Sequence, residues 1–223
     1  MAAFGANLIS GVNYVVAKGI MPDVMQPRAI IFIRVVVAAV VLWLVQIPLK
    51  KEKVSRTDLG KIAIAAILGV VINQILFFEG LNLSTPINVS IIMVCVPIAV
   101  LVFLHFILYE KLSRIKITGI GLGSIGAAIL IIGGGTMKLS YETALGNFLI
   151  VINASCYALY LVLIKPIMMK IYPLAVMKWV FLFGAVGVMP FTLHVFLRTN
   201  FAVIPHQIWI SIGYVVLFTT ILA

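Results

Sequence analysis

The sequence predicts an all-α membrane protein: a polytopic helix bundle of about eight helices, built from inverted five-helix repeats of which the second is incomplete. Of the 223 residues, 64% are hydrophobic and only 10% are charged. The mean hydropathy is +1.25, and the apolar residues form long runs between short basic connections. A soluble domain of this length could not cover so much apolar side chain, and a β-barrel would show short alternating segments instead.

The apolar runs divide the chain into membrane spans. Each run is close to the roughly 20 residues that cross a hydrocarbon core about 30 Å thick. The first run has no basic leader and no cleavage-site pattern, so it is predicted to span the membrane and not to be a signal peptide. In order, the predicted spans cover residues 2–20, 27–48, 60–81, 86–108, 116–134, 144–164, 173–195 and 206–223.

Basic residues are concentrated in every second connection. The second-to-third, fourth-to-fifth and sixth-to-seventh connections carry Lys50, Lys51, Lys53, Arg56, Lys61, Lys111, Arg114, Lys116, Lys165 and Lys170. By the positive-inside rule, this bias places the N-terminus in the cytoplasm. We expect an integral protein of a bacterial inner membrane. The basic residues that give the net charge of +10 lie between the spans and not along one face, so nucleic acid is not an expected partner.

The chain shows a weak internal repeat. Asn13-Tyr14 precedes a lysine in the first span, and Cys156-Tyr157 precedes a lysine in the sixth. A proline then opens the second span and the seventh. A unit of five helices that starts again would place its second copy upside down, which is the inverted-repeat plan of many secondary transporters.

The repeat sets the predicted domain boundaries. The first unit covers residues 1–136, and the second covers 137–223 and stops after three helices. Because Ala223 falls within a helix and no polar tail follows, we expect the native chain to continue.

A set of short motifs is spread along the chain: Gly11-Val12-Asn13-Tyr14, Arg34, Phe78-Glu79-Gly80-Leu81, Pro97, Glu110-Lys111-Leu112 and Gly121. Together they resemble the EamA family of the drug/metabolite transporter superfamily. The resemblance implies ten helices in two inverted repeats around a central cavity. It also implies transport of small metabolites, often outward movement of amino acids or drugs, and that helices nine and ten are missing from this chain.

Two charges lie at unusual depth. Arg34 lies about seven residues inside the second span, roughly 10 Å along a helix. A charge at mid-membrane depth costs at least about 2.5–3.5 kcal/mol, so it needs water or a partner. Glu79 lies near the outer end of the third span, and we expect the two to pair or to share a hydrated vestibule. The alternative is that Arg34 reaches the outer headgroups. Glu79 is the candidate for ion coupling.

Polar and aromatic side chains inside the spans give the remaining candidates for a substrate path. They could offer hydrogen bonds and ring faces to an amphipathic metabolite. The alternative is ordinary hydrogen bonding between helices, with aromatic residues at the membrane interface. These candidates are Asn13, Tyr14, Asn73, Gln74, Tyr157 and Trp179.

Four residues are candidates for hinge or structural roles. Pro97 lacks a backbone donor and should kink the fourth span. Glu110 should tie the corner after that span through neighbouring Lys or Arg. Gly119 and Gly123 form G-x-x-x-G, which favours close helix packing and would suit a homodimer. The G-x-G-x-x-G match at 121–126 lies in a membrane helix, so it is not expected to bind a dinucleotide.

The sequence therefore predicts a secondary transporter, driven by a gradient, that exports small metabolites by alternating access. Its histidines lie far apart and its serines have no evident base, so no catalytic residue, metal or cofactor is expected. A membrane-embedded enzyme or a non-transporting membrane assembly partner are the alternatives.

Overall fold

The computed structural model describes residues 2–48, 52–110, 113–115, 117–119, 121–122, 125, 140–201 and 204–217. Within these ranges the chain is helical and contains no strand. Five helical stretches are long and apolar enough to cross a membrane: Pro27–Gln46, Arg56–Leu83, Pro86–Leu108, Tyr141–Met168 and Pro173–Arg198. The prediction of an all-α polytopic bundle is confirmed.

The helices follow the predicted order along the chain. They are α1 (Ala2–Ile20), α2 (Pro27–Gln46), α3 (Arg56–Ala66), the π-helical segment η1 (Ile67–Ile72), α4 (Asn73–Leu83), α5 (Pro86–Met93), α6 (Val96–Leu108), α8 (Tyr141–Met168), α9 (Pro173–Arg198) and α10 (His206–Leu217). The predicted span 116–134 and the boundary between the repeats at 136 and 137 fall largely or wholly outside the described residues.

Prolines and hydroxyl caps fix where the helices begin. A proline occupies the first turn of α2, α5 and α9, where its missing N–H has no intrahelical partner to lose. The hydroxyl of Ser55 accepts the backbone N–H of Asp58 at 3.1 Å, which caps α3. Ser140 caps α8 in the same way through Thr143, at 3.2 Å. These caps explain why both helices begin a few residues before their apolar runs.

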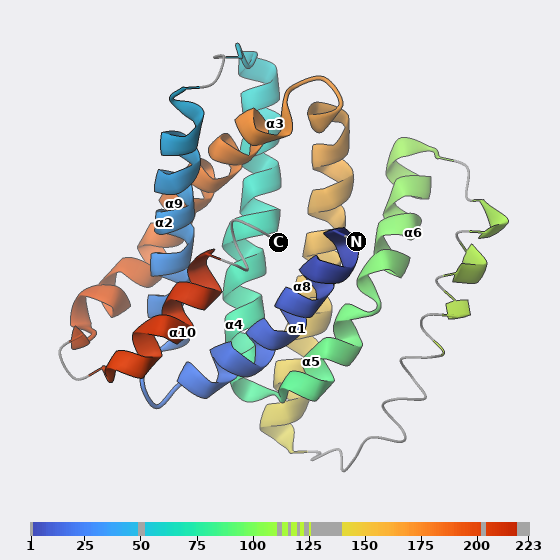
Figure 1. The fold of residues 1–223 in the computed structure, drawn as a ribbon. Helices are drawn as coiled ribbons and strands as arrows, with labels where there is room; N and C mark the ends of the chain where they lie inside the picture. The colour runs from blue at the N-terminus through green and yellow to red at the C-terminus, as the bar shows by residue number, and fades with distance from the viewer. Residues whose placement is uncertain are drawn as a thin grey trace.

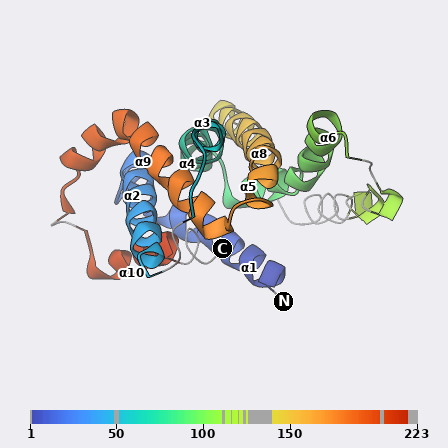
Figure 2. The same cartoon turned by 90° about the horizontal axis from the view of Figure 1, so that it is seen from above.

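The third span is the centre of the bundle. It runs without a break through α3, η1 and α4 and lies between α8 and α9 (Figures 1 and 2). η1 inserts a π-helical turn at mid-span, which the sequence pattern did not predict. At Gly69, within this turn, a Cβ would overlap the ring of Tyr160 on α8. Glycine is therefore needed for the close approach of these helices.

The fourth span is interrupted. α5 ends at Met93 and α6 begins at Val96, with a turn between them. Pro97 occupies the first turn of α6, where no N–H is available to continue the hydrogen bonds of α5. The interruption lies where a kink is expected; a hinge function for Pro97 remains a prediction.

α4 and α8 approach most closely near one end of the bundle, where α1 meets α2 and α4 meets α5 (Figure 1). A Cβ on Gly146 of α8 would lie 2.8 Å from the carbonyl oxygen of Gly80 on α4, and 2.8 Å from the backbone nitrogen of Ser84. Such backbone contact holds helices together in lipid, where apolar side chains gain little from leaving the hydrocarbon. The opposite end carries the basic connections, and we call it the basic end.

Candidate functional site

A charged and aromatic cluster forms inside the bundle from α1, α2, α4 and α8. Only 8% of Arg34 is accessible, and its guanidinium carbon lies 5.7 Å from the ring centroid of Phe78. The Phe77 ring lies 5.3 Å from that of Phe78 and 5.5 Å from that of Tyr14. Tyr14 is within electrostatic range of both Arg34 and Tyr157. The structure thus brings together three predicted path residues from three helices.

The cluster lies at one depth in the membrane. At 1.5 Å per residue, Arg34 is about 10 Å from the start of α2, and Tyr14 is about 9 Å from the end of α1. These two helix ends are joined by a short connection, so the two depths agree. An arginine that extends to the headgroups would be exposed, whereas Arg34 is buried among helices. The geometry therefore favours a charge inside the bundle.

Buried amides extend the polar surface of the bundle interior. The side-chain oxygens of Asn13 on α1 and Gln74 on α4 are buried, and neither has a hydrogen-bond partner among the described residues. On α8, the buried Asn153 donates from Nδ2 to the carbonyl oxygen of Asn73 at 2.7 Å. This bond satisfies the backbone immediately after the π-helical segment. Such π-helical turns often occur at functional sites.

The two tyrosines of α8 have different surroundings. Tyr157 and Tyr160 are stacked, with ring centroids 6.0 Å apart. Tyr160 is only 6% exposed, packs on Gly69, and donates its hydroxyl to Met177 Sδ at 3.5 Å. Tyr157 is 38% exposed although it lies near Tyr14. Tyr157 is therefore the tyrosine of this pair that a ligand could reach, and Tyr160 supports it.

Trp179 lies apart from this cluster. Its ring packs edge-on against Trp43 at 5.4 Å, and the ammonium of Lys178 lies 4.9 Å from the Trp43 ring centroid. Trp43 is nine residues beyond Arg34 on α2, which is about 13 Å along the helix. The structure does not place Trp179 with the other path candidates; it forms a cation–π cluster with α2 nearer the basic end.

Charged side chains tie the end of α4 to its neighbours. The carboxylate of Glu79 pairs with Arg28, with Nε to Oε1 at 2.8 Å, where a pair with Arg34 was one expectation. The other expectation, a hydrated vestibule shared by Glu79 and Arg34, remains a prediction. Arg28 lies in the first turn of α2, six residues before Arg34, which is about 9 Å along the helix. The ammonium group of Lys18 on α1 donates to the carbonyl oxygen of Leu81 at 3.0 Å and to that of Asn82. A cation at a helix C-terminus is favourable because the last carbonyls lack partners.

The corner after α6 is tied to α8. Glu110 pairs with Lys165 near the end of α8, a contact that spacing along the chain could not indicate. Among the described residues, none lies within 4 Å of the place where a Cβ on Gly119 would stand, and close helix packing at this glycine remains a prediction. Gly123 lies outside the described residues.

Asn153 and Lys18 are the structurally important polar residues that sequence reasoning left out of its site. Each has a sequence feature that could have identified it as a candidate. Asn153 is an amide within an apolar helix, like Asn73, and Lys18 is a lysine one turn from a predicted path residue. In the part of the chain that the structure describes, no group of three or more His, Cys, Asp or Glu could hold a metal ion.

Comparisons with known proteins identify the family of the chain. Two curated relatives from Bacillus subtilis are each 27% identical to the chain: the uncharacterized transporter YyaM over 78% of it and the uncharacterized transporter YetK over 98%. The chain spans 55% of the length of YyaM and 67% of YetK. A crystal structure with 15% identity shares the fold, with a TM-score of 0.66 over 93% of this chain and 73% of the other. Residues 1–132 match the EamA-like transporter family, and the chain belongs to that family.

Proposed function

We propose that this integral membrane protein is a secondary transporter that exports small amphipathic metabolites, of the amino-acid or drug-like class, by alternating access. The single observation that carries the proposal is Arg34, a guanidinium buried within the bundle near Tyr14, which in turn lies near Tyr157. A buried charge of this kind marks a solute pathway by default, because it is expensive to keep in a membrane for packing alone.

The chemistry of the cluster suits an amphipathic solute. The guanidinium and the phenol hydroxyls can donate hydrogen bonds to a carboxylate, and the amide oxygens of Asn13 and Gln74 can accept from an amine. The rings of Phe77 and Tyr14 offer apolar faces. Mostly apolar walls with a few convergent polar groups are typical of small-molecule sites.

A cavity lies at each end of the bundle. One of about 430 Å³ lies where the connection between α1 and α2 meets the end of α9, and its lining includes Gln26, His194 and Arg198. The other, of about 280 Å³, lies at the basic end between α3, α6 and α8. We propose that the first is the outer vestibule and that the N-terminus lies in the cytoplasm of a bacterial inner membrane, as the distribution of basic residues favours. An inverted second repeat would close the path.

Transport by the full-length protein in liposomes, assayed with a panel of labelled amino acids and drug-like compounds, tests this function. Tyr157→Phe removes one hydroxyl from the cluster and should slow transport about 2- to 10-fold, as expected for one hydrogen bond of about 0.5–1.5 kcal/mol. Tyr172→Phe makes the same change on an exposed residue between α8 and α9 and should leave transport unchanged. Equal rates in both variants, or no transport above protein-free liposomes, would contradict the proposal.

A further inference from the structure

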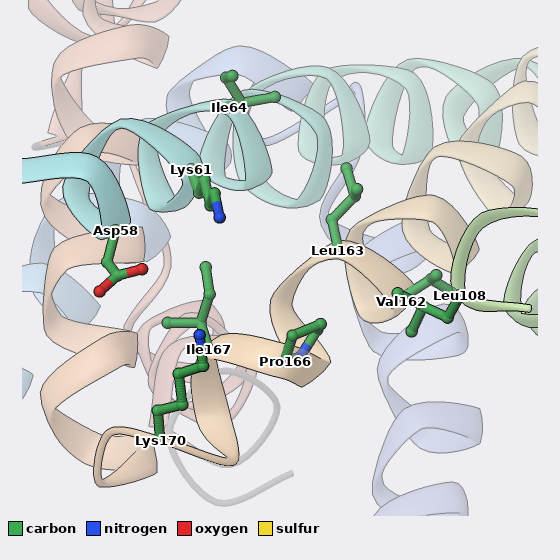
Figure 3. A pocket seen from close by; sticks show the side chains of 9 residues that line it. All are labelled: Asp58, Lys61, Ile64, Leu108, Val162, Leu163, Pro166, Ile167 and Lys170. Carbon is green, nitrogen blue, oxygen red and sulfur yellow. The ribbon is translucent and has the colours of Figure 1, made fainter. Parts of the chain in front are cut away.

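The cavity at the basic end has an unusual combination of walls. It is about 280 Å³ in volume and lies where α3 begins and where α6 and α8 end. Figure 3 shows the ammonium ends of Lys61 on α3 and Lys170 beyond α8 turned toward the same gap, on either side of Ile167. The remaining wall is apolar and includes Leu108, Val162, Leu163 and Pro166.

The two lysines have no neutralising partner in the described part of the chain. Neither ammonium group makes a hydrogen bond or ion pair with a described residue. Asp58 also lines the cavity, but its Oδ2 accepts a hydrogen bond from the Ser55 hydroxyl at 2.7 Å. Two positive charges therefore face one negative charge in this cavity.

The nearest ion pair adds no net charge. Glu110 at the end of α6 pairs with Lys165 on α8, so those two charges cancel. The cavity thus keeps a net positive charge and attracts an anion.

The apolar wall continues onto a face of α6 that the described residues leave exposed. In the span Pro86–Leu108, only 11% of the most apolar stretch is buried within the chain. On α6, Val102, Phe106 and Ile107 are exposed, and they lie one to six residues before Leu108 in the cavity wall. An acyl chain could therefore lie along α6 while the charged end of the same molecule reaches the lysines.

We infer that this cavity binds the headgroup phosphate of an anionic phospholipid, with Lys61 and Lys170 as its ligands and the α6–α8 wall against its acyl chain. Its volume is near the lower end of small-molecule pockets, about 300–1,000 Å³, which suits a headgroup and not a whole metabolite. Basic pockets between membrane helices on the cytoplasmic side bind such headgroups, and anionic lipid is concentrated in that leaflet. The site is separate from the Arg34 cluster, so it does not depend on the proposed transport function.

Binding of phosphatidylglycerol to the detergent-purified full-length protein tests this site, measured by native mass spectrometry and as an upward shift of the melting temperature. Lys61→Gln with Lys170→Gln should weaken binding about 30-fold, at about 1 kcal/mol per lysine. Lys53→Gln with Arg56→Gln removes the same charge from exposed residues that do not line the cavity, and should keep wild-type binding. Equal losses in the two double variants would show general electrostatic attraction and overturn the site.

A second variant keeps the test sharp if the charge change affects folding. Leu163→Trp fills the cavity while both lysines remain, and it should also remove phosphatidylglycerol binding. Wild-type binding in this variant would contradict the proposed lipid site. Phosphatidylcholine should produce no shift. Inorganic phosphate should neither reproduce the shift nor compete at millimolar concentration, and competition would mean a free-anion site and not a lipid site.

Discussion

The contact between α4 and α8 is the packing feature with the clearest quantitative consequence. In Gly146→Ala, the new methyl group would lie 2.8 Å from backbone atoms of Gly80 and Ser84, whereas ordinary contact begins at 3.4 Å. The helices would have to separate by about 0.6 Å, and neither backbone atom can move away alone. Overpacking of this kind costs about 1–3 kcal/mol. For a chain of about 220 residues, this corresponds to a fall of roughly 2–12 °C in melting temperature.

The control is a glycine with space around it. Gly60 is an exposed interior residue of α3, and nothing lies within 4 Å of its would-be Cβ. Gly60→Ala should raise the melting temperature slightly, because alanine favours a helix by up to about 1 kcal/mol over glycine. Thermal unfolding of both variants in the same detergent compares them directly. If Gly146→Ala melts like Gly60→Ala, the helices are not in backbone contact and the reasoning is refuted.

Three further predictions concern polar side chains. Gln74→Leu removes a buried amide oxygen that has no hydrogen-bond partner among the described residues. The free energy of unfolding should stay the same or rise by up to about 1–3 kcal/mol, while liposome transport falls. A loss of stability would show that the amide has a hydrogen-bond partner. Glu79→Gln breaks a half-exposed ion pair with Arg28, so the free energy of unfolding should change by less than about 1 kcal/mol. Gradient-driven transport should be lost. Transport at the wild-type rate would show that Glu79 is not the coupling residue. A double-mutant cycle on Glu110 and Lys165 should give a coupling energy of about 0.2–1 kcal/mol in thermal melts, and zero coupling would mean that the pair does not form.

The sequence was sufficient for the fold because its strongest signals act over one helix at a time. Apolar run length and the prolines at 27, 86 and 173 locate the spans to within a few residues. Those signals are local, since lipid leaves each helix to satisfy its own backbone. The π-helical turn at Ile67–Ile72 escaped prediction because it depends on packing against α8, where Asn153 satisfies the carbonyl of Asn73.

The sequence predicted which types of residue form the candidate site, but it was a poorer guide to which charged residues pair with each other. Burial of a charge at the depth of Arg34 follows from one helix alone, and the structure bears out that Arg34 is enclosed by the bundle. Which acid pairs with which base depends on how two helices are rotated against each other. The ion pairs of Glu79 with Arg28 and of Glu110 with Lys165 were therefore not predicted.

The central claim is that Tyr14, with Arg34 and Tyr157, lines a water-filled path inside the bundle. Thiol labelling measures this most directly, in a background where Cys95 and Cys156 are replaced by serine. Tyr14→Cys should react with a membrane-impermeant reagent, and a transported substrate should slow the reaction. Val15→Cys has the same depth on the same helix but lies on its outer face, 64% exposed, and should stay unreactive in lipid. Labelling of Tyr14→Cys no faster than Val15→Cys, from either side of the membrane, would contradict the account.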